Sequence, residues 1–278
     1  MIPVGRFVVT LMAAGLLAIP ALATADGIML IRAGAFWMGR DDGPPDEAPR
    51  HRVYVRDFWL ERHKVTNAEF ALFLNATGLR PPGGERRYDE DDADARIHRS
   101  GSRWVADPGF ERHPVVEVSW FGARDYCVRT GRRLPTEAEW EKAARGDDHR
   151  PYPWGFAAPA PHLAVFGRVY NATESTDSRP AGASPYGVED MLGNLREWTA
   201  TILRPYPYRS DDGREPYTGA TGRVVVRGAS HDDPADSLGV TRRRSYDRRG
   251  ADAGHHFVGF RCATSEDLGE MAPGGRPR

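Results

Sequence analysis

The spacing of apolar residues predicts a folded domain built from short strands, three helices and long polar loops. Residues 29–39 are predicted to form a strand that ends in a glycine turn. Residues 53–60 alternate partly between apolar and polar side chains, which predicts a second strand. The β-branched run at 224–227 predicts a further short strand.

Three helices are predicted from capping residues that precede apolar positions at helical spacing. Residues 66–69 (Thr-Asn-Ala-Glu) and 136–139 (Thr-Glu-Ala-Glu) both have the capping-box pattern. Ser119 is a suitable N-cap for a helix over residues 120–130, and Gly131 is a suitable stop. Each helix is short, so the fold is expected to contain little regular structure.

The remaining segments are polar and predict loops. Residues 83–103 are rich in charge without apolar periodicity, and we interpret them as a solvated loop. The acidic run at 89–92 could bind a metal, but the interleaved arginines favour a surface loop. Residues 266–278 are predicted to form a flexible Gly/Pro-rich tail. Because no repeat or linker is evident, a single domain is expected over residues 26–265.

Composition and net charge limit the classes of protein to which this chain can belong. The chain has 278 residues, of which 40% are hydrophobic and 28% charged, and this composition is typical of a folded soluble domain. The formal net charge is -1, so charge favours neither a nucleic-acid partner nor an anionic membrane. We therefore expect no nucleic-acid partner.

The N-terminus has the features of a secretory signal peptide. Arg6 precedes an apolar run at 7–19 that is short for a bilayer span, and small-x-small sites follow at 21–23 and 23–25. An uncleaved anchor is the alternative, but the short run and the cleavage sites favour a signal peptide over residues 1–25. The mature protein is then expected to be periplasmic or secreted, with no membrane contact beyond this peptide.

The chain contains two cysteines, Cys127 and Cys262. Two cysteines in an exported protein are candidates for one disulfide, and two inert buried thiols are the alternative. The predicted export favours the disulfide.

Several motifs together resemble the formylglycine-generating enzymes, also called sulfatase-modifying factors. In chain order they are GAFWMG at 34–39, VTN at 65–67, PVVEVSW at 114–120, GRRLPTEAEW at 131–140, YPWG at 152–155, GNLREW at 193–198, RGAS at 227–230 and GFRC at 259–262. Each motif alone is weak, but the set occurs in family order across most of the chain. The relatives include ergothioneine-synthase domains, pyoverdine-maturation proteins and non-catalytic binding proteins.

The resemblance implies an irregular α/β (α+β) domain of the C-type-lectin-like kind, with few regular elements. It also implies that Cys127 and Cys262 form the family's remaining structural disulfide. A bridge across so long a loop would stabilise the fold by about 3–5 kcal/mol in the loop-entropy model.

The resemblance also locates the family's two copper-binding cysteines, and neither is present. Counted from Ser230, their positions hold Asp233 and Leu238. Leucine cannot bind copper, and aspartate is a hard ligand that suits copper(I) poorly. We therefore expect no copper and no cysteine-based oxidation. Ser230, His231, Asp233 and Arg242 are the candidate pocket residues.

Calcium is the cofactor that the resemblance implies. The family's ligand segment corresponds to Asp190, Gly193, Leu195 and Glu197, where two carboxylates and two backbone carbonyls supply oxygen ligands. The alternative is a glycine turn in which Glu197 pairs with an arginine.

Two further clusters are candidates for a metal site and an anion-binding site. His231, Asp233 and the histidines at 255–256 could bind Fe(II) or Zn²⁺, but their spacing favours a packed His231 and a polar loop. The arginines at 242–244 and 248–249 could bind an anionic ligand group or form structural ion pairs.

These observations lead to two main hypotheses. The first is an exported protein, similar to pyoverdine-maturation proteins, that acts on or binds a peptide or secondary metabolite in the periplasm without cysteine or copper chemistry. The second is a non-catalytic module that binds a ligand or a partner protein. A metal-dependent enzyme that uses His231 is a third. Whether the chain is an enzyme stays open on the sequence.

Overall fold

The computed structural model describes residues 27–169, 171–216, 222–248 and 256–265. The predicted signal peptide (1–25) and the predicted tail (266–278) lie outside the described residues. Among the described residues, none of the helices combines the length and the apolar character needed to cross a bilayer.

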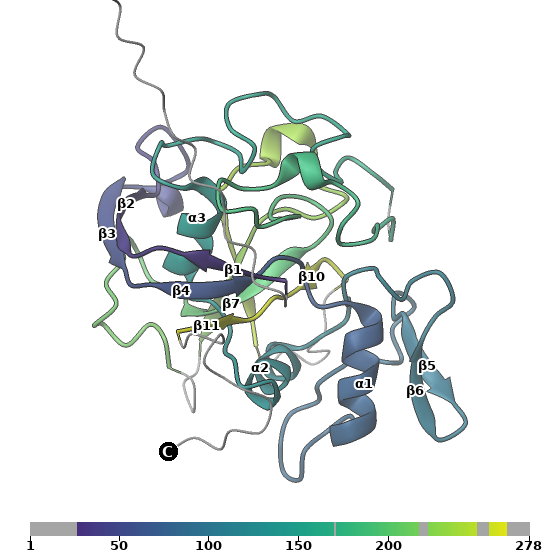
Figure 1. Cartoon of the computed structure of the whole chain (residues 1–278). Helices are drawn as coiled ribbons and strands as arrows, with labels where there is room; N and C mark the ends of the chain where they lie inside the picture. The colour runs from purple at the N-terminus through teal and green to yellow at the C-terminus, as the bar shows by residue number, and fades with distance from the viewer. Residues whose placement is uncertain (1–26, 170, 217–221, 249–255, 266–278) are drawn as a thin grey trace, which may run out of the picture.

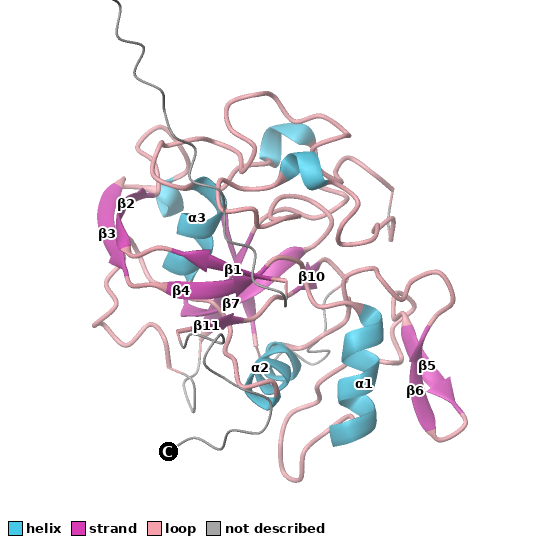
Figure 2. Ribbon diagram, in the orientation of Figure 1, coloured by secondary structure: helices cyan, strands magenta, loops and turns pink. Residues whose placement is uncertain are grey.

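The architecture is an irregular α+β arrangement of small sheets, short helices and long loops (Figures 1 and 2). The α-helices are α1 (Asn67–Thr77), α2 (Trp120–Arg129) and α3 (Glu137–Arg145). The strands are β1 (Ile28–Ile31), β2 (Gly34–Met38), β3 (His51–Val55), β4 (Phe58–Glu61), β5 (Ile97–Ser100), β6 (Arg103–Ala106), β7 (Arg196–Ile202), β8 (Arg223–Arg227), β9 (Arg243–Asp247), β10 (Val258–Gly259) and β11 (Ala263–Thr264). Short 3₁₀ turns lie at Pro45–Glu47, Pro180–Gly182 and Ala235–Ser237.

The three predicted helices are confirmed, and their caps explain where they begin. In α1, Thr66 Oγ1 accepts from the Glu69 amide at 3.3 Å, while a Glu69 carboxylate oxygen accepts from the Thr66 amide at 2.8 Å. Thr136 and Glu139 make the same reciprocal pair at the start of α3. Such a cap contributes about 1 kcal/mol, so local sequence is enough to define these starts.

The strand predictions are confirmed in position but wrong in continuity, and the predicted strand at 53–60 is in fact the two strands β3 and β4. The predicted strand at 29–39 is two strands, β1 and β2, because the chain turns between Ile31 and Gly34. The two strands enter different sheets: β1 pairs with β4, and β2 pairs with β3. The predicted loop at 83–103 also contributes β5, which forms a hairpin with β6 beside α1 (Figure 1).

A four-stranded sheet in the order β10-β7-β8-β9 brings the C-terminal segment to the middle of the chain. The β10 strand runs parallel to β7, with Val258 opposite Arg196 and Gly259 opposite Glu197. All the residues of β7 up to Thr201 are buried, as expected for a strand inside a sheet. This pairing places residues 256–262 next to the loop that leads into β7.

Two apolar clusters form the core. One packs around Trp120, Trp198 and Phe260 under α1 and α2, and the other around Trp140 and Phe36 between α3 and the β2–β3 ribbon. These tryptophans are almost fully buried, which agrees with a core built on aromatic side chains.

Buried ion pairs tie α3 to the four-stranded sheet. Arg227 on β8 donates to Glu137 at 3.0 Å and to Glu141 at 2.5 Å. Arg243 on β9 donates to both carboxylate oxygens of Glu137, at 2.6 and 3.0 Å. At least Arg243 of the arginines at 242–244 is therefore structural.

Candidate functional site

The turn that follows β8 holds three of the predicted pocket residues. Asp233 Oδ2 accepts from the Ser230 amide at 2.9 Å and from the Ser230 hydroxyl at 3.1 Å. The same oxygen accepts from Arg196 at 2.7 Å, and Oδ1 accepts from Arg244 at 2.8 Å. The carboxylate at the first family cysteine position is thus held by its own turn and two arginines, which leaves little capacity for a metal.

The charge of Asp233 is stabilised where it lies. Burial alone would raise the pKa of Asp233, but the Ser230 amide and the guanidinium groups of Arg196 and Arg244 outweigh burial and lower it. Asp233 is therefore a structural anion that fastens the turn to β7 and β9.

His231 is the remaining predicted pocket residue in this turn, and its side chain is buried and packed against its neighbours. Its amide donates to the Asn194 carbonyl at 2.9 Å, and its Nδ1 lies 3.1 Å from the same oxygen. Its ring centroid is 5.8 Å from that of Phe257. Burial lowers the pKa of His231, so the neutral ring is favoured. These contacts agree with a packed His231 rather than with a ligand of a metal held by Asp233.

The second family cysteine position and Arg242 lie elsewhere, at a separate cavity of about 260 Å³. Leu238 and Arg242 line it together with Arg40, Arg145, His149 and Tyr152. Asp42 and Asp236 add negative charge to the same cavity. The structure therefore splits the predicted pocket: Ser230, His231 and Asp233 come together, whereas Arg242 faces the cavity beside Leu238.

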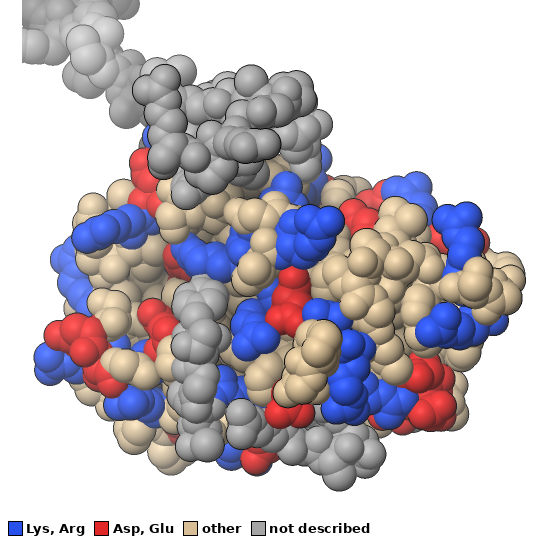
Figure 3. All heavy atoms as spheres, turned by 90° about the horizontal axis from the view of Figure 1, so that it is seen from below, with Lys and Arg blue, Asp and Glu red and all other residues tan. Residues whose placement is uncertain are grey.

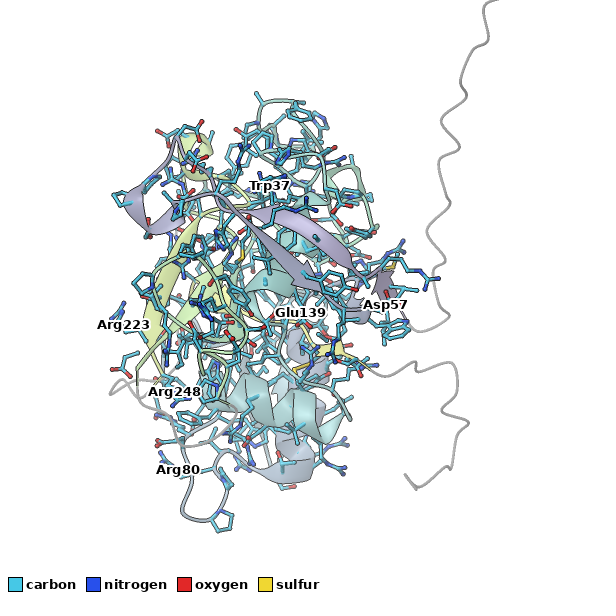
Figure 4. All side chains as sticks on the ribbon, turned by 90° about the vertical axis from the view of Figure 1, so that its left-hand side faces the viewer. Trp37, Asp57, Arg80, Glu139, Arg223 and Arg248 are labelled. Carbon is cyan, nitrogen blue, oxygen red and sulfur yellow. A yellow bond between two sulfur atoms is a disulfide. The ribbon has the colours of Figure 1, made fainter. Side chains whose placement is uncertain are left out.

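A second cavity shares part of this lining. Arg40, Asp42, Arg145 and His149 line both, and Arg50 belongs to the second. The Arg50 guanidinium lies 5.0 Å from the ring of Trp37, which Figure 4 labels on the strand β2. The two cavities thus form a basic and aromatic region between β2, α3 and the segment 236–242.

The predicted calcium segment precedes and enters β7, and its shape has a local cause. A Cβ at position 193 would lie 2.4 Å from the Val165 carbonyl oxygen, so only glycine fits there. Asp190 and Asn194 both have positive φ values, 57° and 62°, which Asp and Asn tolerate better than most residues. The backbone conformation of this turn therefore explains why Asp, Gly and Asn occupy positions 190, 193 and 194.

Lys64 occupies the centre of the predicted calcium ligands. Its Nζ lies 3.0 Å from Asp190 Oδ2 and 3.6 Å from Glu197 Oε1, and it also donates to the Asp190 carbonyl. Arg261 donates to the two oxygens of Glu197 at 2.8 and 3.0 Å. We call these four residues the Lys64 cluster. Burial raises the pKa of Asp190, and the Lys64 ammonium opposes that rise.

The fit of calcium to this segment is poor. Calcium needs six to eight oxygen ligands that are free to face it. Here the Asp190 carboxylate faces an ammonium, and the Glu197 carboxylate is paired with a guanidinium, as in the alternative interpretation of this segment.

Sequence reasoning missed Lys64, although a signal was present. Of the 38 basic residues only Lys64 and Lys142 are lysines. Both are almost fully buried. In a chain that otherwise uses arginine throughout, a lysine indicates a place that requires a compact ammonium group.

The predicted disulfide and the acidic run at 89–92 both lie within the described residues. Cys127 on α2 and Cys262 are joined by a disulfide across a sequence separation of 135 residues. In the acidic run at 89–92, Arg86 pairs with Asp89 at 3.0 Å and with Glu90 at 2.7 Å, so the interleaved arginines do contact the acidic side chains. The histidine at 255 lies outside the described residues.

Comparison with known proteins gives the family. Residues 16–266 match the sulfatase-modifying factor enzyme 1-like domain. The formylglycine-generating enzyme of Mycobacterium tuberculosis is 32% identical, over 82% of this chain and 94% of that protein. The mouse protein named inactive C-alpha-formylglycine-generating enzyme 2 is also 32% identical, over 84% of this chain and 83% of that protein.

Other relatives are longer than the matched region. Pkn1 of Chlamydia caviae, named a serine/threonine-protein kinase, is 33% identical over 85% of this chain, which spans only 37% of that protein. Among solved structures, PvdO from Pseudomonas aeruginosa has a TM-score of 0.65 at 23% identity, over 85% of this chain and 93% of that one. The chain belongs to the sulfatase-modifying factor family and has the fold of the formylglycine-generating enzymes.

Proposed function

We propose that this protein is an exported member of the family that binds, and acts on, a peptide or peptide-like secondary metabolite in the periplasm without cysteine or copper chemistry. The observation that carries the proposal is the cavity beside Leu238, at the position of the second family cysteine. Its lining contains no thiol, so its ligand chemistry has to come from charge and hydrogen bonding.

The charge of this cavity suits a ligand that carries a carboxylate and an amine. Arg145 already donates to the carbonyls of Trp37 and Gly39. Arg242 is held more weakly, 3.4 Å from the Asp236 carbonyl and 3.8 Å from Glu47, and it is the arginine best placed to move to a ligand carboxylate. Asp42 and Asp236 can accept from an amine on the same ligand.

A non-catalytic binding module is the second candidate. A relative named inactive is as similar to this chain as one named a formylglycine-generating enzyme, at 32% identity each. Identity to the family therefore does not decide between catalysis and binding. The mixed surface charge in Figure 3, with acidic and basic residues interspersed on the face shown, favours no single class of large partner.

The contacts of the Lys64 cluster concern calcium, the cofactor expected at this segment. We propose that the Lys64 ammonium supplies the positive charge that calcium was expected to supply, so that this segment needs no calcium. The support is the contact of Lys64 with both predicted carboxylate ligands.

The test uses pools of synthetic pentapeptides with a free C-terminal carboxylate and the same pools amidated. Calorimetry with the full chain should show that free-acid pools bind at least about tenfold more tightly, since charge-assisted pairs to arginine are lost on amidation. Arg242→Ala should abolish this preference. Arg99→Ala, which removes an arginine from the hairpin strand β5, is the matched control and should keep it. Equal binding of both pools by the native chain would refute the proposal.

Mass spectrometry of the same mixtures separates the two candidates. A changed peptide mass identifies an enzyme, whereas binding without a mass change identifies a module. A cysteine-containing peptide should gain no formylglycine, and formation of formylglycine would contradict the assignment of Asp233 and Leu238 to the cysteine positions. If the signal peptide is cut as predicted, the protein isolated from the periplasm begins at Thr24 or Asp26.

A further inference from the structure

Three side chains that are far apart in the sequence meet away from the cavity described above. They are Asp94 in the loop before β5, Glu117 in the segment before α2, and His256 just before β10. His256 Nδ1 lies 3.6 Å from Asp94 Oδ2 and 3.6 Å from Glu117 Oε1. The three potential ligand atoms all lie within 4.8 Å of one another. We call this group the His256 cluster.

Two carboxylate oxygens in this cluster are buried without a donor. Asp94 and Glu117 are each only 2% exposed. Asp94 Oδ2 and Glu117 Oε1 accept no hydrogen bond from any of the described residues. A buried carboxylate oxygen without a donor costs several kcal/mol unless a cation approaches it. Both of these oxygens face His256.

The surroundings orient the two carboxylates toward one point. Asn171 donates to Asp94 Oδ1 at 2.7 Å, which leaves Oδ2 directed at the cluster. Glu117 has a φ of 54°, in the left-handed region that side chains other than Gly, Asn and Asp rarely adopt. Its carbonyl accepts from the Asp89 amide at 2.9 Å, which holds this backbone conformation. Strain of this kind is commonly kept where a side chain has to point in one direction.

The electrostatics of the cluster favour a cation. No lysine or arginine of the described chain is within ion-pair distance of Asp94 or Glu117. Among the described residues, His256 is therefore the only basic side chain placed to pair with these two carboxylates.

From this geometry we propose that Asp94, Glu117 and His256 bind a divalent first-row transition metal ion. Metal–ligand distances of about 2.0–2.2 Å place neighbouring ligand atoms roughly 3.0–3.6 Å apart, close to the spacing observed. One imidazole with two carboxylates suits Zn²⁺, Fe²⁺ or Mn²⁺, whereas Ca²⁺ and Mg²⁺ prefer oxygen ligands alone.

The proposed site has an open side. The His256 side chain is 34% exposed, while the side chains of both carboxylates are almost fully buried, so an ion would enter past His256. Three protein ligands leave at least one coordination position for water or a ligand atom. His231, for which the sequence favours a packed role over a metal ligand, lies nearby: both His231 and His256 contact the ring of Phe257, at centroid distances of 5.8 and 3.9 Å.

The test is metal binding by the full chain after treatment with a chelator. Calorimetric titration with Zn²⁺ should show one ion per chain, and substitution with Co²⁺ should give an absorption spectrum of a nitrogen and oxygen ligand set. Glu117→Gln and His256→Gln should each weaken Zn²⁺ binding by about 100-fold or more, since even secondary contacts of metal ligands contribute 10- to 100-fold.

Two further measurements make the test decisive. Glu117→Gln should leave the melting temperature of the metal-free protein no lower than that of the native chain, because glutamine fills the same space without a charge, so lost binding cannot be attributed to misfolding. His98→Gln removes a histidine that pairs with Asp107 at the surface, and it should leave Zn²⁺ binding unchanged. Absence of binding, or equal binding by the native chain and the Glu117→Gln and His256→Gln variants, would overturn the proposal. Neither result affects the test of Arg242, which concerns a different cavity.

Discussion

The Lys64 cluster and the His256 cluster both bury two carboxylates, yet they differ in what neutralises them. In the Lys64 cluster, Asp190 and Glu197 face an ammonium and a guanidinium of the same chain. In the His256 cluster, Asp94 and Glu117 face one another and a histidine. The first cluster carries its own cations, whereas no lysine or arginine of the described residues pairs with the carboxylates of the second.

This difference bears on the calcium site expected from the family motif. Calcium was expected at the segment that resembles the family's ligands, but that segment is already neutralised by Lys64 and Arg261. The carboxylates that lack a cation lie in residues that match no metal motif. Compensation by charged side chains, and not resemblance of the backbone, decides which carboxylates are free to bind a metal.

The strongest test of this comparison between the two clusters is to remove the buried cation of the Lys64 cluster. Lys64→Met should lower the free energy of unfolding by about 3–5 kcal/mol, because it leaves Asp190 and Glu197 buried with one cation fewer. Lys142→Met is the matched control, since the other lysine donates to the Gly34 carbonyl at 2.9 Å and contacts no buried carboxylate cluster. Its loss should cost only about 1–3 kcal/mol. Guanidinium unfolding of both variants measures the difference.

The response to calcium tests the same comparison in the native chain and in Lys64→Met. The native chain should unfold at the same denaturant concentration with a chelator or with millimolar calcium. Calcium should raise the midpoint of Lys64→Met, in which the oxygens of Asp190 become available. A native chain that loses stability in the chelator would show that calcium binds in spite of Lys64.

Glu61 is an intermediate case and gives a pH dependence. Arg132 lies 2.5 Å from one of its oxygens, and the Cys262 amide donates to the other at 2.7 Å. Burial nevertheless raises the pKa of Glu61 to about 7, against the opposing effects of Arg132 and Arg261 and with a small addition from Glu69. Because the folded-state pKa is raised, the contribution of Glu61 to stability is complete below about pH 4.5 and is lost as the pH rises through 7.

The measurement is the unfolding free energy of the native chain minus that of Glu61→Gln, followed from pH 4 to 8. This difference should fall by about 2–3 kcal/mol across the range. Asp211→Asn is the control: its hydrogen bond from Arg209 lowers the pKa of Asp211, so its contribution changes below this range. A difference that rises with pH would mean that Arg132 outweighs burial.

The helices could be predicted because their signals are local. A threonine and a glutamate three residues apart satisfy each other's backbone groups without any tertiary contact, so Thr66 and Thr136 identify helix starts from sequence alone. The break between β1 and β2 has no such signal. It depends on which sheet each strand joins, and the apolar pattern of 29–39 continues through it.

The site could be predicted only where it lies in one segment. Counting from Ser230 located Asp233 and Leu238, but the arginines that hold Asp233 come from β7 and β9. Lys64 meets Asp190 across 126 positions of sequence. The His256 cluster joins three segments that are far apart in the sequence, and no local pattern reveals their proximity.

The smallest effect is expected where the ion pair is exposed. Arg32 lies 3.6 Å from Asp57, which Figure 4 labels, and the side chains of the pair are 70% and 44% exposed. Water and salt already screen both charges, so Arg32→Ala should change the free energy of unfolding by less than about 1 kcal/mol. Unfolding at low and high salt should show an even smaller difference at high salt. A loss as large as that of Lys64→Met would mean that burial does not explain the cost of breaking the Lys64 cluster, because an exposed pair would then be as costly to break as a buried one.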